Sequence, residues 1–268
     1  MGEAEFEREG SVVTVVLDGQ PQSAVDLEDP ARLHFEYVQH LALCIDTLAP
    51  AGTLRVTHVG GAGLTLARWV QQTRPSSPQV VLEPDTALTE AVRREMPLPR
   101  GHRIRVRPVD GLAGMAALRD ASADVVVVDA YAAGRVPPEL STVEWFVDVG
   151  RVLVPGGLLV ANVADEPGMR YAARVVAGAR EALGHVALVG LHEVLKGKRF
   201  GNLVLAASSR PLDVWTLRRA AASAPLPTGV LSSDEVKRRR PGAQPFSEAA
   251  GDTASSPDPP ERGAWRRR

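Results

Sequence analysis

Acidic residues and glycines recur where predicted strands end in the middle of the chain. A strand over residues 54–59 runs into a glycine-rich turn, and the next predicted strand ends at Glu83. A third strand leads into Asp110-Gly111, and four consecutive valines precede Asp129. In a doubly wound sheet these strand ends lie along one edge, where nucleotide-type ligands bind. The spacing therefore predicts a site for an adenosine-type ligand.

Each residue type at this edge suits one part of a nucleoside. Glycines let a ligand approach the backbone, and the helix after the turn offers free N–H groups. A carboxylate about twenty residues further on, here Glu83, can accept both ribose hydroxyls. Asp110 can accept the exocyclic amine of adenine, and Asp129 can act as an acid or a base. The predicted nucleoside-binding residues of this region are Gly60, Gly61, Gly63, Glu83, Asp110 and Gly111.

Simple structural roles compete with each of these interpretations. A tight turn alone would explain the glycines. A helix cap would explain Glu83 or Asp129, and an Asx turn would explain Asp110. The histidines are scattered along the chain and predict no metal site, and His58 is interpreted as structural because it lies inside a buried strand pattern.

Strand and helix patterns alternate through most of the chain, which predicts an α/β fold with a Rossmann-like, mainly parallel sheet. Residues 1–50 are expected to form a β-hairpin and a helix, and residues 51–222 the nucleoside-binding domain. Residues 232–268 are rich in Pro, Ser and Arg and hold only Phe246 and Trp265 as large apolar groups. Such a segment buries too little surface to offset its ordering entropy, so it is expected to be disordered.

Composition excludes several classes of protein. The net charge of −1 gives no support for a nucleic-acid or membrane-surface binder. A single cysteine, Cys44, excludes an intrachain disulfide and fits a reducing compartment. No apolar run approaches the roughly 20 residues that span a bilayer. The acidic N-terminus lacks the features of a signal peptide, so a cytoplasmic protein acting on a small molecule is expected.

Over residues 12–209 the chain resembles the spermidine synthase family of polyamine aminopropyltransferases, in particular its spermidine synthase-like bacterial branch. The small β-domain motif is present as Leu17-Asp18-Gly19 followed by Gln22, and two positions of the family's helix motif match at Glu36 and His40. The other motifs follow in the family's order: the glycine turn, Glu83, Asp110-Gly111, Asp129 and Pro155-Gly156-Gly157.

The resemblance implies a class I S-adenosylmethionine-dependent transferase fold with a small N-terminal β-region, and a role in polyamine biosynthesis. Gln22 and Glu83 would hold the ribose, Asp110 the adenine amine, and Asp129 would be the general base. The family transfers an aminopropyl group from decarboxylated S-adenosylmethionine to an amine without a metal, and it often forms homodimers.

The chain departs from the family at positions that bind the amine groups. Ala62 replaces the aspartate of the glycine turn, and Ala132 replaces the second carboxylate after Asp129. Candidates for substrate contact at the altered positions are His34, in place of the helix tyrosine, Tyr131, beside Ala132, and Lys196, in a late basic loop. Two alternatives therefore stay open: a methyltransferase that uses S-adenosylmethionine on a small substrate, and a non-catalytic nucleoside-binding homologue.

Overall fold

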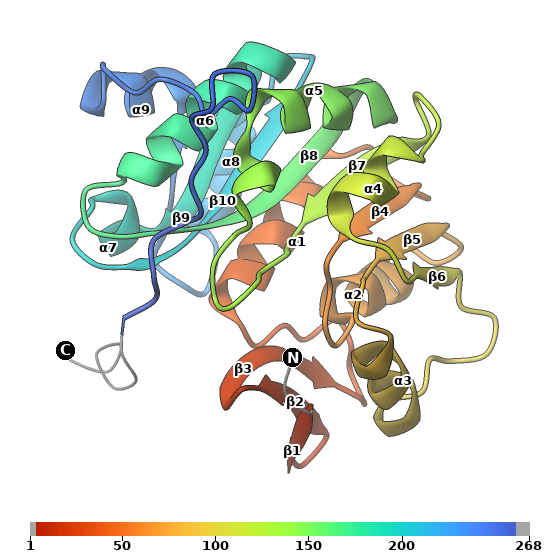
Figure 1. Cartoon of the computed structure of the whole chain (residues 1–268). Coiled ribbons are helices and arrows are strands. Elements are labelled where there is room, and N and C mark those ends of the chain that lie inside the picture. The colour runs from red at the N-terminus through yellow and green to blue at the C-terminus, as the bar shows by residue number, and fades with distance from the viewer. Residues whose placement is uncertain (1–3, 261–268) are drawn as a thin grey trace.

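Two β-sheets organise the protein (Figure 1), and the computed structural model describes residues 4–260. A three-stranded antiparallel sheet is formed by β1 (Glu5–Glu9), β2 (Val12–Leu17) and β3 (Gln20–Asp26). The large sheet has the strand order β11-β9-β10-β8-β7-β4-β5-β6. Its strands are β4 (Val56–Val59), β5 (Gln79–Leu82), β6 (Ile104–Arg107), β7 (Ala123–Val128), β8 (Leu153–Asp165), β9 (His185–Leu191), β10 (Gly201–Ser208) and β11 (Thr228–Ser232).

Helices cover both faces of the large sheet (Figure 1). The helices are α1 (Glu36–Leu48), α2 (Thr65–Thr73), α3 (Thr86–Glu95), α4 (Gly111–Ala116), the 3₁₀ turn η1 (Pro138–Ser141), α5 (Val143–Val152), α6 (Arg170–Leu183), α7 (His192–Leu195), α8 (Val214–Ala222) and α9 (Ser233–Arg239). Helices α1, α2 and α8 pack against one face, and α4, α5, α6 and α9 pack against the other. No helix of residues 4–260 is long and apolar enough to cross a membrane.

The valine run of β7 shows why this strand is buried on both sides. Val125 and Val127 contribute to the core beneath α1 and α8, whereas Val126 and Val128 contribute to the core beneath α5 and α6. Successive side chains of a strand point to opposite faces, so a central strand covered on both faces needs a continuous apolar run.

The order of the parallel strands creates a crevice at their carboxyl ends. Strand β4 pairs in parallel with β5 on one side and with β7 on the other, and the chain passes from β4 to β5 before it returns to β7. Ligands of open α/β sheets bind at such a switch point. The predicted α/β, Rossmann-like fold is confirmed, and it brings the predicted acidic strand ends together.

The N-terminal sheet is attached to the beginning of α2. Its inward-facing Val13 and Val15 share a core with residues of α2 and α3. The hydroxyls of Ser23 and Thr65 lie 2.7 Å apart in a hydrogen bond, which joins β3 to α2. The hairpin of β2 and β3 was predicted, whereas β1, which pairs with β2, was not.

The prediction of a disordered tail is wrong for residues 233–260, and residues 261–268 lie outside the described part. Helix α9 begins with a capping box formed by Ser232 and Glu235. Phe246 is only 2% exposed and packs on Tyr171, with ring centroids 5.3 Å apart. One buried aromatic ring and many backbone and ionic contacts therefore give this segment a fixed structure, although its composition predicted disorder. The large sheet also continues to β11, beyond the predicted domain end at residue 222.

We expect Phe246→Ala to lower the free energy of unfolding by about 3 kcal/mol, because a buried aromatic side chain leaves a cavity when it is removed. Trp215→Ala is the matched control, since Trp215 is 65% exposed and its loss should cost about 0.5 kcal/mol or less. Urea unfolding of both variants measures the difference. Equal, small effects would show that the C-terminal segment is not docked on the core.

Candidate functional site

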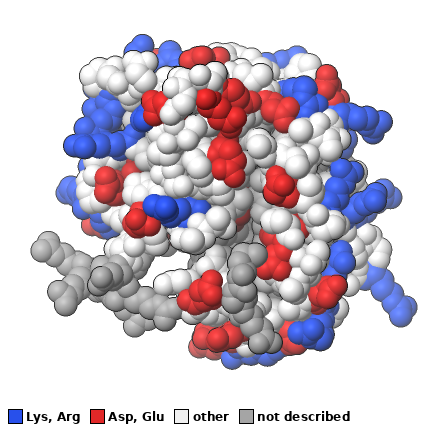
Figure 2. All heavy atoms as spheres, viewed as in Figure 1, with Lys and Arg blue, Asp and Glu red and all other residues white. Residues whose placement is uncertain are grey.

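A cavity of about 690 Å³ lies at the carboxyl ends of β4, β5 and β7. Figure 2 shows a face of the molecule with a central hollow and acidic side chains around it. Eight of the residues proposed from the sequence line the cavity: Gln22, Gly60, Gly61, Glu83, Asp110, Gly111, Asp129 and Tyr131. Three do not: Gly63, His34 and Lys196. The residues predicted at the strand ends, Gly60, Gly61, Glu83, Asp110, Gly111 and Asp129, thus lie around one cavity.

The glycine turn brings two strand ends into direct contact. Gly60 has a φ of +78°, and a Cβ there would lie 2.4 Å from the carbonyl oxygen of Asp129. A side chain at this position would push β4 and β7 apart. Gly63 instead packs against β3, where its N–H donates to the Ser23 hydroxyl at 3.2 Å. The first glycine thus serves strand packing at the cavity, and Gly63 serves the N-terminal sheet.

Glu83 and Asp110 both accept hydrogen bonds from backbone N–H groups, but only Asp110 caps a helix. Glu83 accepts a hydrogen bond from the Asp85 N–H at 3.1 Å, and burial raises the pKa of Glu83. The cap of α3 is Asp85, so Glu83 is not committed to that role. Asp110 caps α4 through a 2.8 Å hydrogen bond from the Ala113 N–H to Oδ1. Both carboxylates line the cavity, and the cap role of Asp110 leaves its other oxygen without such a bond to the helix.

Asp129 is held by two side chains from distant parts of the chain. The Asn162 amide donates to Asp129 Oδ1 at 2.9 Å, and the Tyr37 hydroxyl also donates to this carboxylate. Burial raises the pKa of Asp129 to about 6, and the two donors oppose this rise. Burial and the Asp129 charge raise the pKa of Tyr37 well above its usual value, so Tyr37 remains a hydroxyl donor.

Sequence reasoning missed both partners of Asp129. Tyr37 recurs with the apolar residues of α1 at helical spacing, which gives no sign of its role, while His34 was predicted to contact the substrate. His34 precedes the helix, and its Nε2 lies 4.0 Å from Asp26 Oδ2. Asn162 carried a usable signal: it is a polar residue, 4% exposed, inside an otherwise apolar strand. Buried amides need partners, which marks such positions as candidates.

The late basic loop does not reach the cavity. Lys196 is exposed and follows α7 as its C-terminal cap. Arg199 pairs with Glu193 of α7 at 3.3 Å. The charged residues that line the cavity are all carboxylates: Glu83, Asp110, Asp129, Glu139 and Glu248. Among residues 4–260 no Lys or Arg lines it, so the cavity favours a cationic ligand.

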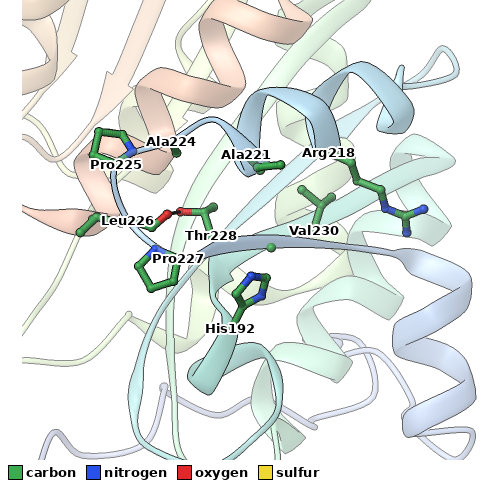
Figure 3. A pocket seen from close by; sticks show the side chains of 11 residues that line it. His192, Arg218, Ala221, Ala224, Pro225, Leu226, Pro227, Thr228 and Val230 are labelled. Carbon is green, nitrogen blue, oxygen red and sulfur yellow. Dashed lines mark hydrogen bonds between the residues drawn. The ribbon is translucent and has the colours of Figure 1, made fainter.

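A second cavity, of about 600 Å³, lies beside β11 (Figure 3). It is bounded by α8, the loop that follows and β11, and His192 and Arg218 are among its lining residues. Arg218 is already paired with Glu235. A Cβ on Gly229 would lie 2.8 Å from His192 Nδ1, so this histidine packs on the strand backbone. None of the strand-end carboxylates lines this cavity, and it is not the candidate site.

The described residues hold no cluster of three or more His, Cys, Asp or Glu side chains that could bind a metal ion. At the candidate site, carboxylates, hydroxyls and amides surround Asp129. Asp129 can accept a proton, because its pKa lies close to neutrality. The remaining carboxylates can bind hydroxyl groups or positive charge.

No family model matches the chain. A polyamine aminopropyltransferase from Chromobacterium violaceum is 26% identical over 164 residues, which cover 60% of this chain and only 62% of that relative. A probable spermidine synthase from Corynebacterium glutamicum is 30% identical, with a TM-score of 0.83 and coverage of 96% of this chain and 95% of that one.

More distant solved structures share the fold. A spermidine synthase in complex with the transition state analogue AdoDATO is 16% identical, with a TM-score of 0.58 and coverage of 94% and 80%. Human methyltransferase-like protein 13 in complex with SAH is 18% identical, with a TM-score of 0.57 and coverage of 80% and 96%. With near-complete coverage at 30% identity to the Corynebacterium protein, the chain belongs to the spermidine synthase-like family of transferases.

Proposed function

We propose that this protein binds an S-adenosyl-type nucleoside in the cavity and transfers an aminopropyl group from it to an amine. The observation that carries the proposal is the position of Asp129, a hydrogen-bonded carboxylate with a raised pKa, in a cavity lined by four other carboxylates. The relatives named as aminopropyltransferase or spermidine synthase support the reaction type. The bound AdoDATO and SAH of the two distant structures support the ligand type.

The lining fits an adenosine-type ligand. Glu83 at the end of β5 and Gln22 on β3 would hold the ribose hydroxyls, and Asp110 would accept the adenine amine. Leu112 is 43% exposed and lines the same cavity, so it offers an apolar surface to the purine ring. An exposed leucine beside a carboxylate that can accept from an amine is the combination that adenine requires.

Asp129 would act as the general base. When bound, a decarboxylated S-adenosylmethionine supplies the sulfonium-activated carbon that is transferred, and methylthioadenosine is the other product. Asp129 takes the proton that the attacking amine nitrogen loses, and its pKa of about 6 keeps it largely ionised at neutral pH. Tyr37 and Asn162 orient the carboxylate by donating to it. A base held in one orientation reduces the entropy cost of proton transfer.

The charge of the cavity favours the decarboxylated ligand. Intact S-adenosylmethionine carries a carboxylate, and no Lys or Arg of the described residues lines the cavity to neutralise it. A negative group placed among carboxylates is repelled. Ala62 supports the competing function, methyl transfer, because it lacks the carboxylate that would bind the aminopropyl ammonium in the family. Methyl transfer is therefore the second candidate.

We expect the protein to bind decarboxylated S-adenosylmethionine at least tenfold more tightly than the intact form, because of the acidic lining. Glu83→Ala should weaken the binding of both forms, and of methylthioadenosine, at least tenfold by removing the ribose acceptor. Calorimetry measures the Kd of each of the three ligands, and Glu90→Ala on the exposed face of α3 is the control. Preference for the intact form would move the assignment to methyl transfer, and no binding of any ligand would refute the proposed function.

Asp129→Asn should reduce kcat about 10²- to 10⁴-fold, the usual contribution of a general base. In the wild type, log(kcat/KM) should show an inflection near pH 6, the pKa of Asp129 in the free protein, with activity lost as the pH falls. Tyr37→Phe removes a donor that lowers this pKa, so the inflection should move to higher pH. A pH profile unchanged by either substitution would exclude Asp129 as the base.

Asp129→Asn should also stabilise the fold at high pH. The folded pKa of about 6 lies above the ordinary value of 3.8, so the ionised carboxylate destabilises the folded state above pH 6 and the penalty disappears below about pH 4. The free energy of unfolding of the variant should exceed that of the wild type by up to about 3 kcal/mol at pH 8, and by much less at pH 4. Urea unfolding at the two pH values measures this, and a pH-independent difference would contradict the raised pKa.

A further inference from the structure

The end of the chain runs beside the wall of the nucleoside cavity. We call residues 244–259 the C-terminal strap. Figure 1 shows the dark blue chain leaving α9, passing close to α5 and α6 and then running down toward the C-terminal end of the picture. The loop from residue 130 to residue 137 and the turn η1 lie between β7 and α5, and they contribute to the cavity lining. The contacts between the strap and this wall fall at two places.

The first attachment lies just after η1, at the start of α5. The Val143 N–H donates to the Phe246 carbonyl oxygen at 2.9 Å, in a bridge between Thr142 and Phe246. The Phe246 ring is buried, and the Arg174 guanidinium lies 3.8 Å from its centroid. A buried ring and a backbone hydrogen bond fix this end of the strap to the protein core.

Glu144 reinforces the first attachment. Its carboxylate accepts hydrogen bonds from the Ser247 hydroxyl at 2.7 Å, the Glu248 N–H at 3.1 Å and the Ala249 N–H at 3.2 Å. These donors lower the pKa of Glu144 to about 2, so it is ionised at neutral pH. The turn that carries Glu248 is therefore held by one charged side chain from α5. Glu248 itself lines the cavity.

The second attachment lies just before η1. The Val136 N–H donates to the Ser256 hydroxyl at 2.9 Å, and the Ser256 N–H donates to the Val136 carbonyl oxygen at 3.3 Å. Ser256 is only 1% exposed. Arg135 also pairs with Asp258 at 3.3 Å, at the surface. Without the Ser256 hydroxyl the buried Val136 N–H would lose its acceptor, which is costly.

The two attachments bracket the part of the wall that faces the ligand. Pro137, Glu139 and Leu140, all cavity-lining residues, lie between Val136 and Val143. We propose that the C-terminal strap positions this wall for nucleoside binding, with Ser256 and Glu144 as positioning residues and Glu248 as a strap residue that faces the ligand's positive charge. The inference rests on the proposed nucleoside-binding function and adds to it a segment that lies outside residues 12–209, where the family's motifs are found.

The physical reason for such a strap is the irregular loop that it fastens. Ala133 and Gly134 both have positive φ values, 49° and 76°, in a turn that the paired Ala132 and Arg135 close, and the rest of the loop has no regular structure before η1. A loop of this kind loses conformational freedom when a ligand orders it, which weakens binding. Contacts that order the loop beforehand remove that cost. The strap does so from outside, without occupying the cavity centre.

The test measures two properties of the full-length protein. Ser256→Ala and Glu144→Gln should each increase backbone hydrogen exchange of residues 130–142 without ligand, and raise the Kd for methylthioadenosine about five- to tenfold. Ser223→Ala, at the C-terminal cap of α8, is the matched control and should change neither property. Glu248→Gln should weaken decarboxylated S-adenosylmethionine more than neutral methylthioadenosine, whereas Glu90→Gln should affect both equally little.

Each outcome decides the proposal. Raised exchange together with raised Kd supports the strap. Unchanged exchange in both variants overturns it, as does raised exchange with an unchanged Kd. A wild type that binds no nucleoside would refute the proposed function, and the strap would then be decided by hydrogen exchange alone. A Glu248→Gln effect of equal size on both ligands would remove this residue from the ligand contacts.

Discussion

The close contact between the ends of β4 and β7 is the constraint on which the site depends. Gly60 touches the Asp129 carbonyl group, its N–H donates to the Leu82 carbonyl oxygen at 2.9 Å, and the Asp129 N–H donates to the Val59 carbonyl oxygen at 2.9 Å. Three strand ends are thus joined by backbone contacts within one turn. Any side chain at residue 60 would separate them. This backbone geometry places Glu83 and Asp129, which follow β5 and β7, at the same edge of the sheet.

A second constraint follows from burying Asp129. A carboxylate removed from water is destabilised unless donors reach it, and the donors come from α1 and β8. Helix α1 must therefore pack on the large sheet against β8. From the sequence, this helix was instead grouped with the N-terminal hairpin, in residues 1–50. The arrangement leaves the pKa of Asp129 near 6 instead of returning it to its usual value. Incomplete compensation is what makes the group useful as a base near neutral pH.

The features that were predictable from sequence are those whose signal is local. Strand ends with an acid or glycine, and the uninterrupted valines before Asp129, identify the sheet and its ligand edge because they depend only on neighbouring residues. Tyr37 could not be separated from the core residues of α1, since its role depends on a partner 92 positions away. Strand β11 holds only two large apolar residues, Val230 and Leu231, and follows a proline-rich turn. The strap is held by contacts of individual residues, such as the packing of Phe246, and the amino-acid composition of the segment does not reveal these contacts.

The charge of the cavity explains how a site can depart from its family's motifs and keep their electrostatic character. The carboxylates expected at residues 62 and 132 are absent, and both positions line the cavity as alanines. Two other carboxylates enter from elements that those motifs do not include: Glu139 from η1 and Glu248 from the strap. The attraction of a cationic ligand depends on the summed electrostatic field of the lining, and it depends less on which element carries each charge. Selection for a positively charged substrate can therefore act through a loop and a chain end, where substitutions disturb the packed sheet least. Under the proposed function, the negative charge is held at other positions than in the family's motifs, and the cavity keeps the charge that would attract an amine.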